Sequence, residues 1–339
     1  MADIGIGIIG GGYMGKAHSV AFSSVGALFD TPLKPRLQAI AASSVASAER
    51  YRAQYGFVEA ATDWRAVVHN PNVEAVVIAS PQNTHRDIAL AAFEAGKPVL
   101  CEKPLGASLT DGIAMVEAAE KSAQINMIGF NYIRTPVSQY ARLMIAEGKL
   151  GDVTWFRMEH TEDFYADPQD GEGWRLQGRA NGCMGDLAPH PINATLAFMG
   201  PIAEVMADVK TVHAQRNGVA VTNDDQAQIM CRFANGVTGH IFVSRVATGR
   251  KMGYIYEIFG TKGALRFNQE DQNALWYYDA HGPEAERGFR HILAGPDHPD
   301  YVKFCLGPGH GTGYQDTVII EAKDFLDAIY TGEAKWPTF

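Results

Sequence analysis

Residues 4–15 read IGIGIIGGGYMG, an apolar run followed at once by the glycine pattern G-x-G-x-x-G, which consists of Gly10, Gly12 and Gly15. A helical pattern starts at Lys16, so the glycines stand between an expected strand and an expected helix. In such a turn the first glycine bends the chain, the second lets the backbone approach a pyrophosphate, and the third allows close helix packing. The positive end of the helix dipole favours phosphate charge. The start of the chain therefore predicts a dinucleotide-binding site, with Tyr13 and Met14 beside the glycines.

Short apolar runs alternate with helix-length amphipathic stretches through the first 130 residues. The expected strands cover residues 4–9, 37–42, 75–79, 98–101 and 125–129, and the clearest helical patterns cover residues 47–54, 85–95 and 109–122. Short connections between such elements are typical of a doubly wound parallel sheet. We therefore expect an α/β Rossmann domain over residues 1–130.

The period changes after about residue 131. Apolar residues alternate with other residues over 226–233, and an Asn-Gly turn leads to a second alternating run over 237–243. Further strand candidates cover residues 153–160, 203–211, 254–259 and 264–267. Residues 131–339 are therefore expected to form an α+β domain built on a mainly antiparallel sheet.

Composition excludes several classes of protein. The chain has 29 Lys+Arg against 38 Asp+Glu, a formal net charge of −9, which disfavours binding to nucleic acid. We find neither an apolar run long enough for a membrane span nor a signal-peptide pattern, so a cytoplasmic protein with no membrane partner is expected. The four cysteines form no C-x-x-C pair, and no disulfide framework or structural zinc site is indicated.

The second expected strand bears on the choice between NAD and NADP. In dinucleotide-binding folds an acidic residue at this point binds the adenosine ribose, but here the strand runs into Ser43 and Ser44. The serines could bind a 2′-phosphate with help from Arg50, which slightly favours NADP over NAD. Alternatively, the serines only cap the next helix, and NAD is held by backbone and water.

Five segments together resemble the glucose-fructose oxidoreductase, inositol dehydrogenase and MocA family. They are residues 10–15, 80–85 (SPQNTH), 101–104 (CEKP), 185–190 (GDLAPH) and 256–263 (YEIFGTKG). The family usually has T-P-N-x-x-H where this chain has S-P-Q-N-T-H. The resemblance implies a Rossmann domain, a second α+β domain with a large open sheet, a nicotinamide cofactor and a sugar or cyclitol substrate. It also implies a homodimer or homotetramer that assembles through the open sheet.

Three residues fit the chemistry that this resemblance implies. A secondary alcohol gives up a hydride only as its proton leaves, so the site needs a base and a positive group beside the developing alkoxide. We assign His190 as the general base, Lys103 as its partner and alkoxide stabiliser, and Asp186 as an orienter and hydroxyl acceptor. Pro189 requires a helix that starts near Leu187, so Asp186 could instead be only an N-cap and His190 only a core histidine.

Further residues are expected around these three. The cofactor is expected to contact the loop after the third strand, the E-K-P segment and a Trp-Arg pair, namely Ser80, Pro81, Asn83, His85, Glu102, Lys103, Trp174 and Arg175. The substrate is expected to contact Asn131, Tyr132, Arg134, Arg175, Asp186, His190 and His310. Residues 160–170 contain one histidine and several acids, but their spacing matches no metal-ligand pattern, so we interpret them as solvated and expect no metal.

The sequence thus predicts an NAD(P)-dependent oxidoreductase, similar to inositol dehydrogenase, that interconverts a secondary alcohol and a ketone or lactone on a cyclitol, sugar or sugar derivative. Two alternatives stay open. One is a glycosidase that uses tightly held NAD for a transient oxidation, and the other is a non-catalytic dinucleotide sensor on the same scaffold. A sensor has no need of a proton relay, and the joint presence of Lys103, Asp186 and His190 disfavours it.

Overall fold

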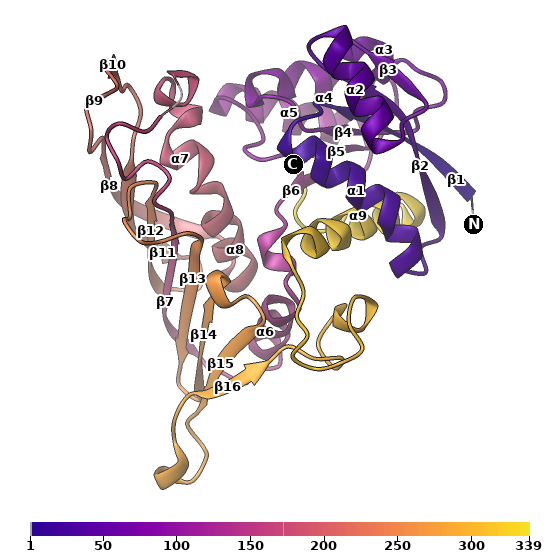
Figure 1. Ribbon diagram of the computed structural model, residues 1–339. Coiled ribbons are helices and arrows are strands. Elements are labelled where there is room, and N and C mark those ends of the chain that lie inside the picture. Colours follow the sequence, from indigo (N-terminus) through magenta and orange to yellow (C-terminus); the bar gives the residue numbers. More distant parts are fainter. Residues whose placement is uncertain (1, 172) are drawn as a thin grey trace. The chain divides into compact units, whose positions relative to one another are not determined.

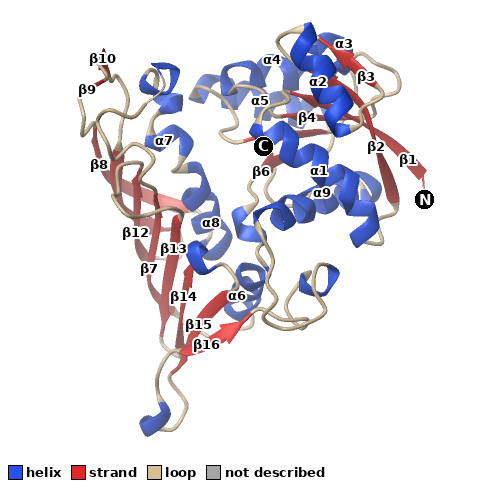
Figure 2. Cartoon of the chain, viewed as in Figure 1, coloured by secondary structure: helices blue, strands red, loops and turns tan. Residues whose placement is uncertain are grey.

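A computed structural model describes residues 2–171 and 173–339 and divides the chain into two compact units (Figures 1 and 2). Unit 1 contains residues 1–131 and 313–339, and unit 2 contains residues 132–312. The sequence analysis expects a boundary near residue 130 and a second domain over residues 131–339, whereas this division groups residues 313–339 with unit 1.

Unit 1 is built on a six-stranded parallel sheet in the order β3-β2-β1-β4-β5-β6. The strands are β1 (Ala2–Ile9), β2 (Leu33–Ala41), β3 (Glu59–Ala61), β4 (Ala75–Ile78), β5 (Val99–Glu102) and β6 (Asn126–Gly129). The strand order reverses between β1 and β4, and in open α/β sheets ligands bind beyond the carboxyl ends of the strands at such a point. The predicted Rossmann fold is confirmed.

Helices pack against this sheet. They are α1 (Tyr13–Leu28), α2 (Val45–Tyr55), α3 (Trp64–Val68), α4 (His85–Glu94), α5 (Leu109–Ser122) and α9 (Tyr314–Thr331), with a 3₁₀ turn η1 (Gln82–Thr84) before α4. β4 and β5 are buried along their whole length, as expected of parallel strands covered on both faces.

The end of the chain returns to unit 1. Helix α9 lies beside α1 (Figure 1). Beyond α9 the tail reaches the outer strand β6, where the backbone N–H of Ile128 donates to the carbonyl of Pro337 at 3.0 Å. The ring of Phe339 packs edge-on against Phe93, with their centroids 5.5 Å apart. These contacts join residues far apart in sequence, so no local pattern indicated them.

Unit 2 is built on an eight-stranded sheet in the order β16-β15-β14-β13-β7-β12-β11-β8. Its strands are β7 (Val153–Thr161), β8 (Ile202–Lys210), β11 (Gln226–Phe233), β12 (Thr238–Ser244), β13 (Gly253–Gly260), β14 (Gly263–Asn268), β15 (Ala274–Asp279) and β16 (Arg290–Leu293). Among the described strands of this sheet, β7 and β12 pair in parallel and the other neighbours pair antiparallel, which confirms a mainly antiparallel sheet. The hairpin predicted from the Asn-Gly turn is β11 and β12.

The remaining elements of unit 2 cover one face of this sheet and form its loops. The helices are α6 (Pro136–Ala146), α7 (Cys183–Asp186) and α8 (Pro189–Met199). A small ribbon, β9 (Gln215–Arg216) and β10 (Val219–Ala220), and the 3₁₀ turns complete the unit: η2 (Tyr132–Arg134), η3 (Gly173–Leu176), η4 (Arg179–Asn181), η5 (Gln269–Asp271), η6 (Glu284–Glu286) and η7 (Tyr301–Lys303). Residues of α6 and α8, such as Val137 and Phe198, pack on the buried sheet side chains Phe156 and Tyr256. Within the described residues, no helix is both long and apolar enough to span a membrane.

Candidate active site

The glycine turn after β1 has the geometry that the sequence predicts. Gly10 has φ 99°, and a Cβ at this position would overlap the carbonyl oxygen of Ala79. A Cβ on Gly15 would overlap the carbonyl oxygen of Gly10. In contrast, a Cβ on Gly12 would meet nothing within 4 Å. Steric crowding explains Gly10 and Gly15, while Gly12 leaves open space where a pyrophosphate can approach the backbone.

Helix α1 begins directly after this turn. Its N-cap residue is Gly12, which has no side chain to occupy the first N–H groups of the helix. Tyr13 is 73% exposed, and Met14 contacts the hydroxyl of Tyr314. These features fit a bound dinucleotide phosphate, because the N–H groups and the dipole of α1 both favour an anion.

Ser44, which follows β2, is the N-cap residue of helix α2. The Ser44 side chain accepts a hydrogen bond from the backbone N–H of Ser47, and the Ser47 side chain in turn accepts from the backbone N–H of Ser44, which makes a capping box at the start of α2. The guanidinium of Arg50 lies over the ring of Tyr51 at 4.8 Å. The helix-capping alternative therefore holds for Ser44, and the sequence-based preference for NADP gains no support.

His85 joins two loops at the carboxyl edge of the sheet. Its Nε2 lies 2.9 Å from the carbonyl oxygen of Ser80, and its Nδ1 lies 3.0 Å from that of Pro104. Burial is the main cause that lowers the pKa of His85. Pro81 and Asn83 are exposed in the segment between Ser80 and His85. His85 thus ties the loop after β4 to the loop after β5, the two loops that the sequence places near the cofactor.

Lys103 is the first residue after β5, and its side chain is partly exposed. The preceding Glu102 is only 6% exposed, and its carboxylate turns inward. Glu102 Oε1 lies 2.8 Å from Nε2 of His18, and Oε2 accepts a hydrogen bond of 3.2 Å from the backbone N–H of Lys103. Glu102, which the sequence analysis expects at the cofactor, makes these contacts within the protein. The sequence pattern singled out Glu102 but not His18.

Asp186 lies in unit 2 at the end of α7, and its carboxylate forms an ion pair of 3.3 Å with Arg175. The next helix, α8, begins at Pro189 as proline demands, within two residues of the expected start. Its N-cap residue is Ala188, which has no capping side chain. The alternative that Asp186 serves only as the N-cap is therefore wrong.

His190 follows Pro189 in α8 and is 6% exposed. Its ring centroid lies 4.4 Å from that of Tyr132 and 5.5 Å from that of His160. His160 is buried on β7, where its Nδ1 lies 3.1 Å from the carbonyl oxygen of Leu187 and its Nε2 lies 3.0 Å from Oε1 of Glu162. The interpretation of His160 as solvated is therefore wrong: it supports the bend between α7 and α8.

The approach to Asp186 depends on two acids that the sequence did not single out. Asp224 Oδ2 accepts hydrogen bonds from the backbone N–H of Met184 at 2.7 Å and from the Cys183 thiol at 2.9 Å, which fixes the start of α7. The neighbouring Asp225 is fully buried and pairs with Arg245 at 2.9 Å and with Arg216 at 3.4 Å. Asp224 lies 40 and 41 positions from its partners, and Asp225 lies 20 positions from Arg245 and 9 from Arg216, so no short motif indicated these contacts.

The remaining residues expected at the cofactor or the substrate differ in burial and lie on different elements. Asn131 is buried in unit 1 and donates to Thr317 Oγ1 at 2.9 Å, whereas Arg134 is buried in unit 2 at 2% exposure. His310 is exposed in the glycine-rich loop before α9. Trp174 lies in η3, but its side chain falls outside the described residues. Of the three proposed catalytic residues, Lys103 belongs to unit 1, and Asp186 and His190 belong to unit 2.

Comparison with known proteins matches both halves of the chain. Residues 4–130 match the oxidoreductase family with an NAD-binding Rossmann fold, and residues 138–266 match the GFO/IDH/MocA C-terminal domain. The chain belongs to the GFO/IDH/MocA oxidoreductase family. The resemblance deduced from the five sequence segments is confirmed.

Several relatives of this GFO/IDH/MocA protein have named activities. Levoglucosan dehydrogenase from Pseudarthrobacter phenanthrenivorans is 36% identical, in an alignment that covers 100% of this chain and 92% of the relative. Myo-inositol 2-dehydrogenase from Thermotoga maritima is 27% identical over 97% of this chain and 89% of the relative. A solved levoglucosan dehydrogenase in complex with NADH and levoglucosan matches 99% of this chain and 92% of that chain, with a TM-score of 0.96 and 36% identity.

Proposed function

We propose that this protein is an NAD-dependent dehydrogenase that oxidises one secondary hydroxyl of a sugar, an anhydrosugar or a cyclitol to a ketone, or to a lactone where the carbon is anomeric. The observation that carries the proposal is the similarity to levoglucosan dehydrogenase along the whole of this chain, at 36% identity. The similarity to myo-inositol 2-dehydrogenase supports a polyhydroxylated ring as the substrate class. The glycine turn and the uncapped start of α1 fit the dinucleotide.

The proposed mechanism gives each catalytic residue one task. His190 accepts the proton of the hydroxyl group, and Lys103 places a positive charge beside the oxygen as it becomes an alkoxide. Asp186 stabilises the imidazolium of His190 and accepts a hydrogen bond from a neighbouring hydroxyl, while Arg175 pairs with Asp186. Bound NAD supplies the acceptor for the hydride that leaves the same carbon. The alcohol thereby loses one proton and one hydride.

We assign the substrate contacts to residues on several elements. Tyr132 is the best supported of these, because its ring packs against that of His190 at 4.4 Å. Polyols present many hydroxyl groups, so aromatic and polar side chains around the base would set which hydroxyl reacts. The proposed set is Asn131, Tyr132, Arg134, Arg175, Asp186, His190 and His310.

We propose NAD rather than NADP as the working cofactor. The relative of known structure is bound to NADH, and here Ser44 is engaged as a helix cap. Ser43 remains exposed at the end of β2, where its hydroxyl can bind the ribose diol. The ratio of kcat/KM for NAD and NADP tests the choice, and a ratio that favours NADP would overturn it.

The exposed face of the unit 2 sheet supports a homodimer or homotetramer. Large apolar side chains stand exposed on it, among them Met206, Met230, Trp155 and Trp276 at 66%, 57%, 39% and 40% exposure. An apolar surface of this kind marks an interface between subunits more often than a free surface. We also propose a cytoplasmic location, where NAD and its reduced form exchange as free co-substrates.

A substrate screen tests the proposed function. Levoglucosan, the inositol isomers and common aldoses would each be incubated with NAD or NADP, and the absorbance of reduced nicotinamide would be followed. We expect catalytic, continuous reduction of NAD by at least one cyclic polyol. A glycosidase would cleave a glycoside without net reduction, and a sensor would bind NADH without turnover, and either result would contradict the proposal.

A further inference from the structure

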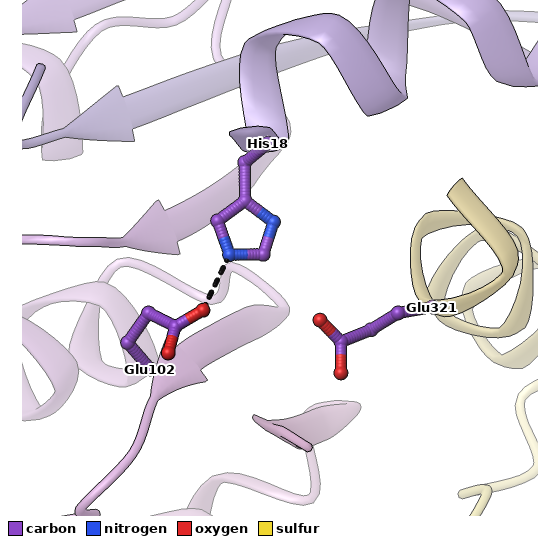
Figure 3. Close-up of side chains that lie close together, drawn as sticks. All are labelled: His18, Glu102 and Glu321. Atoms are coloured by element: carbon purple, nitrogen blue, oxygen red, sulfur yellow. Dashed lines mark hydrogen bonds and ion pairs between the residues drawn. The ribbon is translucent and has the colours of Figure 1, made fainter. Parts of the chain in front are cut away.

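Three buried ionisable side chains meet inside unit 1, next to Lys103. His18 comes from α1, Glu102 from the end of β5 and Glu321 from α9 (Figure 3). Potential ligand atoms of the three residues all lie within 4.8 Å of one another. His18 and Glu321 are fully buried and Glu102 nearly so. Burying charged side chains is costly in free energy unless they are paired and hydrogen-bonded to one another, so the cluster needs an explanation.

The carboxylate of Glu102 links a helix to the backbone of the proposed catalytic lysine. One oxygen lies 2.8 Å from Nε2 of His18, and the other accepts from the backbone N–H of Lys103. The backbone of Gly129 on β6 lies close to this carboxylate, because a Cβ built there would lie 2.8 Å from Glu102 Oε1. The two contacts of Glu102 place its carboxylate between α1 and the backbone of Lys103.

The charges within the cluster support a protonated His18. Full burial on its own lowers the pKa of His18, but the hydrogen bond and charge of Glu102 and the charge of Glu321 raise it and together outweigh burial, so the net shift is upward. Together, the groups that face His18 are one carboxylate from β5 and one from α9. An imidazolium in this place neutralises one of two buried negative charges and strengthens the hydrogen bond to Glu102.

The backbone that follows Lys103 is also fixed by a contact with a buried side chain. The carbonyl oxygen of the next residue, Pro104, lies 3.0 Å from Nδ1 of His85, whose Nε2 lies 2.9 Å from the carbonyl oxygen of Ser80. The backbone at Lys103 is thus fastened before and after its side chain. A side chain that stabilises an alkoxide needs this kind of support, since small misplacements of a catalytic group are costly.

We propose that His18 is a positioning residue of the dehydrogenase: through Glu102 it fixes the backbone of Lys103 so that the ammonium group is presented to the substrate oxygen, and the charge of Glu321 on α9 faces His18 from the other side. The inference rests on the proposed function, because it takes Lys103 as the catalytic lysine. It adds a residue that lies in α1, 84 positions before Glu102 in the chain.

A proton rather than a metal ion fits the centre of the cluster. His18 Nε2 and Glu102 Oε1 are 2.8 Å apart, which is the length of a direct hydrogen bond, so each atom already has the other as its partner. Prolonged treatment with a chelator should leave activity unchanged. Loss of activity that zinc restores would overturn the proposal in favour of a metal site.

The first test compares two substitutions of His18. The amide nitrogen of His18→Gln can still donate to Glu102, whereas His18→Leu has a similar volume and no donor. We expect His18→Leu to lower kcat about 10- to 100-fold, with the KM for sugar and the Kd for NADH within about threefold of wild type. His18→Gln should restore most of kcat. Equal activity of the two variants, whether high or low, would overturn the proposal.

A second variant disturbs Glu102 without touching His18. Gly129→Ala pushes a methyl group against the Glu102 carboxylate, and we expect kcat to fall as in His18→Leu. Gly26→Ala is the matched control, because Gly26 lies in α1 and a Cβ there meets nothing within 4 Å. If His18→Leu fails to fold, Gly129→Ala decides the matter. A Gly129→Ala enzyme with the kcat of the control would contradict the proposal.

Two further readouts separate this inference from the proposed function. In a Lys103→Met background, His18→Leu should cause no additional loss of kcat, and additive losses would show that His18 does not act through Lys103. Amide hydrogen exchange at Lys103 needs no substrate and should be faster in His18→Leu than in wild type. If wild type reduces no NAD with any sugar, the proposed function fails, while faster exchange still supports the contact through Glu102 and unchanged exchange overturns it.

Discussion

Two buried histidines on either side of Lys103 have pKa values that are shifted in opposite directions. The carboxylates of Glu102 and Glu321 raise the pKa of His18 in spite of its burial, whereas burial lowers the pKa of His85 among backbone carbonyl groups. Burial alone does not set the pKa of a histidine, because the charged groups that face the ring also shift it. The sequence could not show this difference, because the facing groups lie far from each histidine in the chain.

The raised pKa of His18 predicts a pH-dependent contribution to stability. A histidine whose folded pKa lies above its unfolded value of 6.5 stabilises the fold fully below that value, and this stability is lost as the pH rises through the folded pKa. The difference in Tm between wild type and His18→Gln should thus be largest below pH 6.5 and shrink as the pH rises through the raised pKa of folded His18. The exposed His69 provides the control, His69→Gln. A difference in Tm that stays constant across this range would contradict a protonated His18.

The pairing of Asp186 with Arg175 predicts a catalytic rather than a structural effect of Asp186→Asn. On the proposed assignment, loss of the carboxylate lowers the pKa of His190 and lowers kcat/KM. The acidic limb of the pH profile for alcohol oxidation should therefore move to lower pH. The ion pair is partly exposed and contributes about 0.5 kcal/mol or less, so Tm should barely change. A lower Tm with an unmoved profile would remove Asp186 from the mechanism.

At the scale of elements, the sequence predicted those whose pattern is local. The buried runs of β1, β4 and β5, and the alternation along β11 and β12, follow directly from side-chain periodicity. The short β3 was missed, because three residues carry too little periodicity. The return of α9 to unit 1 and the contact of the tail with β6 were missed too, since both depend on pairing between distant segments.

Contacts between distant segments also limit what the sequence predicts of the candidate site. The glycine turn, Lys103 and the pair of Asp186 and His190 could be singled out because each belongs to a short motif. His18, Asp224 and Asp225 act through partners in other elements, so they carry no signal in the linear sequence. A sequence reading alone can thus name the residues of a motif, but it does not find the residues that support them.

The glycine turn before α1 allows a test of cofactor binding that spares the fold. A Cβ on Gly12 meets no atom of the protein, so Gly12→Ala should fold with a Tm close to that of wild type. The added methyl group enters the space expected for the pyrophosphate, and the Kd for NADH should rise about tenfold or more. Gly26→Ala in the same helix should bind NADH as wild type does. Normal NADH affinity in Gly12→Ala would mean that the dinucleotide does not approach this turn.

At the scale of the whole molecule, the open sheet of unit 2 predicts the assembly. Met230 lies opposite Met206 in the pairing of β11 with β8, and both are exposed in the monomer. Met230→Glu should leave the monomer folded but break the oligomer, because a carboxylate would have to be buried without a partner. Leu306→Glu, at a residue in a loop that is also exposed, is the control. Light scattering would reveal the change in mass, and an unaltered oligomer would place the interface elsewhere.

The rate of NADH formation shows whether the chain oxidises a polyol with NAD at a site that contains Lys103. Wild type, Lys103→Met and the control Lys121→Met, on the exposed last turn of α5, would be compared with the best substrate of the screen. We predict steady turnover by wild type and by the control, and a kcat about 10² to 10⁴-fold lower for Lys103→Met with unchanged NADH affinity. A Lys103→Met enzyme within about threefold of wild type would contradict the account.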